Sequence, residues 1–179
     1  GAFRKPREIN WVVGVTMLLL GMVNGFAGYS LLDDQLSAVG LRIANSMILS
    51  IPVGGTWLSS LAFGGPYPGP DTLQRLFVAH VLLIPALLAG LIGVHLALLI
   101  RSKHTHFPGK REREDNVVGQ RLWPTYAAKA VGLFFLTAAL LALLGGVAQI
   151  NAIWNYGPFR VANVSSASQP DWYMGWPDG

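Results

Sequence analysis

Two histidines, His80 and His95, stand in a long apolar stretch of this sequence. Ionisable side chains are rare at membrane depth, and where they occur they are candidates for function. On an α-helix, fifteen residues separate the two rings by about 22 Å along the axis and by about 60° around it. Both imidazoles therefore face one side of the helix at two different levels.

A neutral imidazole is a ligand for haem iron, so two such levels would suit two stacked haems, one near each membrane surface. The alternative is that each histidine bonds to a neighbouring helix and has a structural role only. The spacing of the histidines does not by itself decide between these two explanations.

A glycine stripe in the preceding apolar stretch bears on that choice. Gly14, Gly21 and Gly28 recur every seven residues and share one helix face to within about 20° per heptad. In an antiparallel helix pair, Gly28 lies at the level of His80 and Gly14 at the level of His95, where a missing side chain leaves room for a flat cofactor. Close packing of two helices through small residues is the alternative explanation.

Three apolar stretches must carry these residues, at roughly 11–31, 76–100 and 128–148, each close to the ~20 residues that cross a bilayer as a helix. Hydrophobic residues make up 52% of the chain and charged residues 12%, with a mean hydropathy of +0.43. Soluble proteins carry about 25% charged residues. The sequence therefore predicts an all-α integral membrane protein, a transmembrane helical bundle with short interfacial helices, and not a disordered or nucleic-acid-binding protein. Without cysteine, this chain forms no disulfide, iron–sulfur ligand or thioether-attached haem.

Basic residues indicate the orientation of the spans. Ten of the thirteen Lys and Arg residues lie before the first apolar stretch or between the second and third. The positive-inside rule places these segments on the cytoplasmic side. We therefore expect a multi-pass protein of the cell membrane, with the N-terminus and loop 102–127 in the cytoplasm.

Segment 32–75 is too apolar for a solvated loop, and Pro52 and Gly54 divide it. We expect a pair of short helices at the outer interface. The predicted divisions of the chain are a first span (1–31), the outer interfacial hairpin (32–75), the histidine-bearing span (76–101), the cytoplasmic loop (102–127), a third span (128–148) and an outer loop (149–179). Because the sequence begins without Met and ends in a polar stretch, we also expect a window of a longer chain.

Short stretches along the whole chain form a further pattern. They are Phe3–Trp11 with Gly14, Gly28-Tyr-Ser-Leu31 with Gln35, Ser50–Gly55, Thr72-Leu-Gln-Arg75 followed by His80, then His95, and Pro170-Asp-Trp-Tyr173. In this order and spacing they resemble cytochrome b of the quinol-oxidising cytochrome bc complexes, of the bc1 and b6f type. The acidic pair Asp33-Asp34 and the Asp of Pro-Asp-Trp-Tyr are similar to the bacterial branch that oxidises menaquinol.

The resemblance implies that the three spans are the third to fifth helices of the family. It implies two b haems, with His80 a ligand of the outer, lower-potential haem and His95 a ligand of the inner one, while Gly14 and Gly28 make room for them. Each iron would take its second histidine from a helix outside this sequence. Arg75 either faces a haem propionate or extends to the outer interface.

The resemblance also implies two quinone sites. At the outer site, Asp171 is the expected proton acceptor, because apolar surroundings raise the pKa of a carboxyl toward the range that suits a base. Tyr173 is expected to donate a hydrogen bond or gate the pocket, and a solvated loop carboxylate is the alternative for Asp171. The remaining residues expected in the quinone pockets are Gly40, Ile51, Pro52, Gly54 and Pro170 at the outer site, and His104 and Lys129 at the inner site.

The implied function is that of the di-haem cytochrome b of a respiratory quinol:cytochrome c reductase, which oxidises (mena)quinol outside and passes electrons across the membrane with proton translocation. The implied partners are a Rieske iron–sulfur protein, a cytochrome c-type subunit, the remainder of cytochrome b and the lipid bilayer, in a dimeric complex. Two alternatives remain at this point. One is a cofactor-free transporter or anchor subunit with structural histidines, and the other is a two-haem cytochrome b of a dehydrogenase or hydrogenase.

Overall fold

The computed structural model describes residues 3–65, 69–102, 121–148 and 156–163, and these residues are mainly helical. The elements are α1 (Glu8–Ser30), α2 (Gln35–Leu49), α3 (Gly55–Phe63), α4 (Thr72–Val78), the π-helical turn η1 (Ala79–Leu83), α5 (Ile84–Ser102), the π-helical turn η2 (Leu122–Tyr126) and α6 (Ala127–Val147). The described part of the chain has one isolated β-bridge, between Asp34 and Pro158. The predicted all-α class is confirmed.

Three helical runs are long and apolar enough to cross a membrane: Glu8–Ser30, Thr72–Ser102 and Leu122–Val147. The second run joins α4, η1 and α5 without a break. A helix is the expected form, because it satisfies every backbone hydrogen bond within its own segment where water is absent. Few side chains of these runs are buried within the chain, so their surfaces are available to lipid or to other helices.

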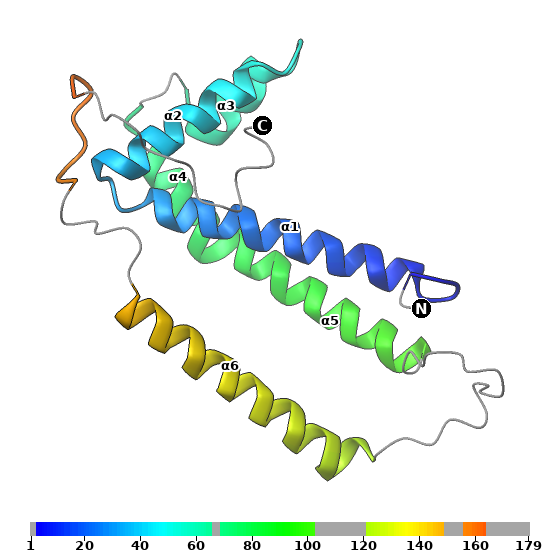
Figure 1. The fold of residues 1–179 in the computed structure, drawn as a ribbon. Helices are drawn as coiled ribbons and strands as arrows, with labels where there is room; N and C mark the ends of the chain where they lie inside the picture. Colours follow the sequence, from blue (N-terminus) through cyan, green and yellow to red (C-terminus); the bar gives the residue numbers. More distant parts are fainter. Residues whose placement is uncertain (1–2, 66–68, 103–120, 149–155, 164–179) are drawn as a thin grey trace. The chain divides into compact units, whose positions relative to one another are not determined.

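The helices α1 and α5 lie side by side and antiparallel (Figure 1). At one end of this pair, the Arg7 guanidinium donates a hydrogen bond to the Ser102 carbonyl (3.1 Å). At the other end, α1 runs into the α2–α3 pair and α4 precedes η1. We call these the Arg7 end and the hairpin end.

At the hairpin end, α2 begins with a buried capping box. The Asp34 carboxylate accepts a hydrogen bond from the Ser37 N–H (2.7 Å), and the Ser37 hydroxyl accepts one from the Asp34 N–H (3.1 Å). These bonds satisfy backbone donors that a helix start leaves free. Two of the most deeply buried groups of the described chain, Asp34 and Ser37, are thus polar groups with a defined structural task.

The helix α3 folds back on α2. Gly55 begins α3 directly against the end of α2, where an added Cβ would lie only 2.9 Å from the Leu49 carbonyl oxygen. The Ser59 hydroxyl donates a hydrogen bond to the Asn45 side chain (2.6 Å) and joins the two helices. Between them, Val53 has a φ of 66°, a left-handed conformation that costs a β-branched residue stability.

The remaining span belongs to a separate compact unit, residues 105–152. Its described helical elements are η2 and α6, and α6 is apolar apart from Lys129 and Thr137. Lys129 lies in the first turn of α6 and is exposed.

Candidate functional site

His80 packs against the glycine stripe of α1 near the hairpin end. A Cβ added at Gly28 would lie 2.9 Å from both ring nitrogens of His80, so only glycine leaves space for the imidazole there. The Nδ1 of His80 lies 2.9 Å from the Asn24 backbone carbonyl oxygen. Because a carbonyl oxygen only accepts, this contact requires the proton on Nδ1 and leaves the lone pair on Nε2. Nε2 is then the atom of His80 that is free to ligate a metal.

His95 faces the same stripe nearer the Arg7 end. A Cβ added at Gly14 would lie 3.6 Å from the Cε1 of His95, which is an ordinary contact distance. The Nδ1 of His95 is buried and has no hydrogen-bond partner among the described residues. An unsatisfied buried nitrogen is costly, so this ring calls for a partner such as a cofactor or another helix.

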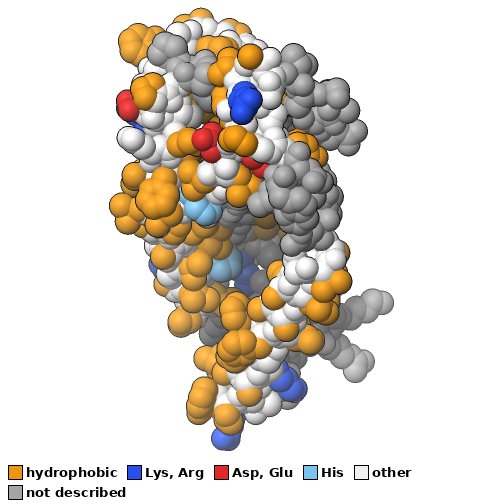
Figure 2. All heavy atoms as spheres, turned by 90° about the vertical axis from the view of Figure 1, so that its left-hand side faces the viewer, with side chains coloured by type: hydrophobic (Ala, Val, Ile, Leu, Met, Phe, Trp, Pro, Cys, Tyr) orange, Lys and Arg blue, Asp and Glu red, His pale blue; other side chains and the backbone are white. Residues whose placement is uncertain are grey.

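The structure brings the four residues together in the pairs expected from the sequence, Gly28 with His80 and Gly14 with His95. Between the two levels, a Cβ added at Gly21 would meet no atom within 4 Å. Among the described residues, direct packing of α5 on α1 therefore does not account for Gly21, whereas packing of another helix through small residues stays open. Both rings are half-buried, and Figure 2 shows histidine side chains at two heights of the face in view, with hydrophobic side chains on one side of each.

These residues fit b haem as a cofactor. His80 and His95 lie at separate levels, each beside a glycine at which a Cβ would narrow or fill the space, and imidazole is a common protein ligand of haem iron, so each could hold one iron. The orphaned Nδ1 of His95 is consistent with a site completed from outside the described residues. No cluster of three or more metal-ligating side chains occurs in the part of the chain that is described.

The turn that carries His80 was not predicted from the sequence. His80 lies in η1, where the Ile84 N–H bonds to the Ala79 carbonyl five residues earlier instead of four. The sequence prediction assumes the same rotation per residue along the whole helix, so it does not include this turn. Pro85, which follows it directly, is the signal that would have found it, since proline interrupts the hydrogen-bond ladder of a helix.

The expected outer quinone pocket is only partly within the described residues. Ile51 and Pro52 are exposed, and added Cβ atoms at Gly40 and Gly54 would meet nothing within 4 Å. The pocket residue Pro170 and the catalytic candidates Asp171 and Tyr173 lie outside the described residues, as does His104 of the expected inner site. Lys129 lies in the separate unit. The composition of both quinone sites therefore stays a prediction.

A docking segment, residues 156–163, is fixed to the start of α2 by Gln35, to which the sequence analysis gave no role. The Gln35 amide donates to the Asn163 carbonyl (3.1 Å), and its side-chain oxygen accepts from the Arg160 N–H (3.0 Å). The Gln35 N–H also donates to the Gly157 carbonyl (3.2 Å). Gln35 is only 6% exposed, and a buried amide needs partners at both ends.

Arg42 adds a second fastening of the docking segment. Its guanidinium lies 5.4 Å from the centre of the Phe159 ring, within the range of a cation–π contact. It also lies 3.4 Å from the Val161 carbonyl oxygen, to which it donates. The docking segment is therefore held to α2 along its length.

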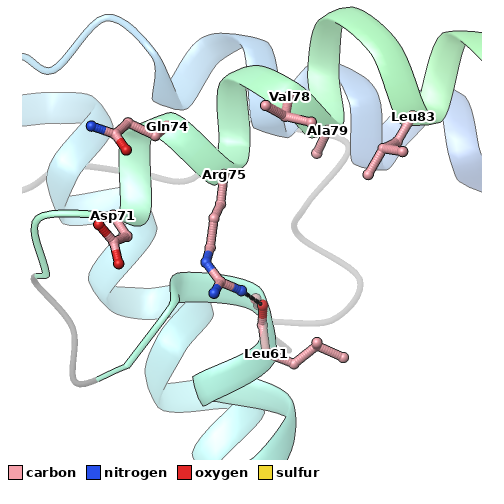
Figure 3. A pocket seen from close by; sticks show the side chains of 8 residues that line it. Leu61, Asp71, Gln74, Arg75, Val78, Ala79 and Leu83 are labelled. Carbon is pink, nitrogen blue, oxygen red and sulfur yellow. Dashed lines mark hydrogen bonds between the residues drawn. The ribbon is translucent and has the colours of Figure 1, made fainter.

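Arg75 lies at a surface cavity of about 700 Å³ beside α3 and α4. Figure 3 shows its side chain reaching from α4 toward α3, where it donates to the Leu61 carbonyl (3.0 Å). Gly64 ends α3 with a φ of 80°, and an added Cβ there would lie 2.6 Å from the Nε of Arg75. Arg75 thus ties α4 to the end of α3, and its expected role at a haem propionate stays a prediction.

The chain is similar to known proteins along its length. A family model described as Cytochrome b(N-terminal)/b6/petB matches residues 1–158. The chain is similar to the cytochrome bc1 complex cytochrome b subunits of three bacteria, with 52% identity to that of Corynebacterium efficiens, 51% to that of Mycobacterium tuberculosis and 49% to that of Streptomyces coelicolor. Each match covers 100% of this chain and 33% of the relative. The chain therefore spans about a third of the length of these curated relatives.

A solved structure described as a hyperthermophilic respiratory complex III has a similar fold. It matches with a TM-score of 0.72 and 23% identity, over 97% of this chain and 47% of that chain. At this identity the likeness supports the fold alone.

Proposed function

This chain belongs to the cytochrome b family, and we propose that it forms the part of a bc1-type quinol:cytochrome c reductase that holds one ligand of each of two b haems. In this proposal the complex oxidises menaquinol at the outer side of the cell membrane and passes electrons across it with proton translocation. The observation that carries the proposal is the placement of His80 on Gly28 and His95 on Gly14. Family membership argues against the transporter and anchor alternatives.

When bound, b haems supply one-electron transfer through the low-dielectric membrane. His80 and His95 would each hold one iron. The hydrogen bond from His80 Nδ1 to the Asn24 carbonyl (2.9 Å) orients the ring and increases its electron donation through Nε2. Such donation stabilises ferric iron, which supports a lower potential at His80 than at His95.

The hairpin end is the outer end in this proposal, and it carries the quinol site. Asp171 accepts a proton from a quinol hydroxyl, Tyr173 donates a hydrogen bond, and Gly40, Ile51, Pro52, Gly54 and Pro170 line the pocket. The docking segment supports this arrangement, because it fixes Asn163 to α2. In the sequence, Asp171 follows Asn163 by only eight residues, and for this reason the proposal assigns Asp171 to the hairpin end.

The Arg7 end is cytoplasmic in this proposal. His104, which lies within the basic loop 102–127, and Lys129, which follows that loop, deliver protons to a quinone reduced on that side. The partners are a Rieske protein, a cytochrome c-type subunit and the remainder of cytochrome b, which supplies the second ligand of each iron, in a dimeric complex.

The haem proposal is tested in the full-length cytochrome b within its complex. We expect His80→Ala and His95→Ala each to remove about half of the b haem seen in reduced-minus-oxidised optical spectra, because each removes an axial ligand. His106→Ala is the matched control, since it removes an imidazole that the proposal does not use. Full haem content in both single variants would contradict the proposal.

The outer site is tested separately with Asp171→Asn. We expect quinol oxidation to slow by about 10²-fold or more, as for loss of a general base, while the optical spectra of both haems stay unchanged. Asp178→Asn, a change of the same type in the same segment, is the control. Unchanged quinol turnover in Asp171→Asn would remove this carboxylate from the mechanism.

A further inference from the structure

The histidine spacing and the glycine spacing differ by one residue. His80 and His95 are fifteen residues apart, whereas Gly28 and Gly14 are fourteen apart. On two uniform antiparallel α-helices, the extra residue adds about 1.5 Å of rise and about 100° of rotation. If one imidazole lay directly on its glycine, the other would then be turned by about 100° from the direction that fourteen steps give.

Both imidazoles nevertheless lie on their glycines. Added Cβ atoms would come within 2.9 Å of the His80 nitrogens at Gly28 and 3.6 Å of His95 Cε1 at Gly14. The difference in spacing is absorbed inside η1, where the Ile84 N–H reaches back five residues to the Ala79 carbonyl. A π turn within an α-helix accommodates one extra residue, so fourteen α-helical steps remain between the histidines.

Pro85 explains why the extra residue is accommodated at this point. Proline has no N–H, so the α-helical ladder is interrupted where Pro85 should donate. An extra residue breaks the fewest backbone hydrogen bonds when it lies beside such an interruption. Placed elsewhere in the helix, it would break α-helical hydrogen bonds that Pro85 leaves intact. The side chains within the turn do not impose it by packing inside the chain, because Val81, Leu82 and Leu83 are 55%, 61% and 55% exposed.

We propose that the π turn Ala79–Leu83, held in place by Pro85, matches the fifteen-residue spacing of the histidines to the fourteen-residue spacing of the glycine cradles. Pro85 is a positioning residue in this arrangement, since it acts through the helix and not on the iron. The inference rests on the proposed function, because the groups brought into register are the proposed ligands and cradles of the two haems.

Two single-residue deletions in the full-length cytochrome b, purified within its complex, test the inference. Leu82 and Leu87 are both exposed leucines, 61% and 57%, and they lie on opposite sides of Pro85. Deletion of Leu82 converts the π turn into an α-helical turn, so we expect both haems to be retained with unchanged low-spin electron paramagnetic resonance signals. Deletion of Leu87 leaves the π turn in place and rotates His95 by about 100°, so we expect about half of the haem to be lost.

A rescue variant separates a register effect from general damage. Combining deletion of Leu87 with Pro85→Ala releases the π turn, which then converts to an α-helical turn and restores fourteen steps, so haem content should recover. Equal haem loss in the two deletions, or no recovery in the combined variant, would overturn the register proposal. Full haem content in both His80→Ala and His95→Ala would instead overturn the proposed function, so the two failures are distinguishable.

Discussion

The two ends of the α1–α5 pair hold their histidines in different ways. At the hairpin end, His80 bonds to a backbone carbonyl at 2.9 Å and fills the space over Gly28. At the Arg7 end, His95 lies on Gly14 at ordinary contact distance, with its Nδ1 buried and unpartnered among the described residues. The comparison indicates that the hairpin end orients its ring within this chain, whereas the Arg7 end needs a group from elsewhere.

The two ends also differ in the hydrogen bonds that hold their surroundings in place. The hairpin end is fastened by the Asp34–Ser37 capping box and by the hydrogen bonds of Gln35 to the docking segment. At the Arg7 end, the bond from Arg7 to Ser102 joins the two helices. Rigid surroundings keep a reaction geometry in place, and the proposed quinol oxidation site is at the hairpin end.

The largest expected difference between the ends comes from adding a methyl group at each glycine. Gly28→Ala places a Cβ 2.9 Å from both imidazole nitrogens, too close for the ring to stay, whereas Gly14→Ala places one at 3.6 Å. We expect Gly28→Ala to remove most of the haem at His80, which is about half of the total, and Gly14→Ala, whose Cβ narrows the cradle without displacing the ring, to remove clearly less. Optical spectra of the purified complex measure both.

Gly21→Ala is the control for this pair, because its added Cβ meets nothing within 4 Å. If Gly14→Ala lost as much haem as Gly28→Ala, the two levels would be equally tight and the contrast between the ends would be wrong.

The glycine stripe and the histidines were predictable because helical periodicity is local and regular. The break between α2 and α3 was predictable for a similar reason, since a proline and two glycines so close together disfavour a continuous helix. The docking segment was not predictable, because its partners are more than a hundred residues away along the chain and a polar loop has no periodicity. The π turn was missed because a single extra residue changes the helical step at one point only.

The second expected effect concerns the docking segment. Gln35→Leu keeps the size of the side chain but removes its hydrogen bonds to the Asn163 carbonyl and the Arg160 N–H, at a cost of about 1–3 kcal/mol for the two bonds together. We expect quinol oxidation to slow by roughly 5–100-fold, because the chain leading to Asp171 loosens, while both haem spectra stay normal. Steady-state turnover with a menaquinol analogue is the measurement.

Gln74→Leu is the matched change at an exposed glutamine of α4, and it should leave turnover unaffected. Haem loss in Gln35→Leu would show that the docking segment supports the α1–α5 pair itself. The effect of Gln35 would then not be specific to the quinol site.

The smallest expected effect is the difference in reduction potential between the two levels. The hydrogen bond of His80 to the Asn24 carbonyl would favour ferric iron by at most its own net strength of about 1 kcal/mol, which is roughly 40 mV for a one-electron couple. A redox titration of the complex should therefore give the lower potential to the haem that His80→Ala removes. Because the acceptor is the backbone carbonyl, Asn24→Ala should change neither reduction potential by more than a few millivolts. A reversed order, or an equal one, would show that the surroundings of the rings outweigh the hydrogen bond. A change of order in Asn24→Ala alone would assign the effect to the side chain of Asn24 and not to its carbonyl.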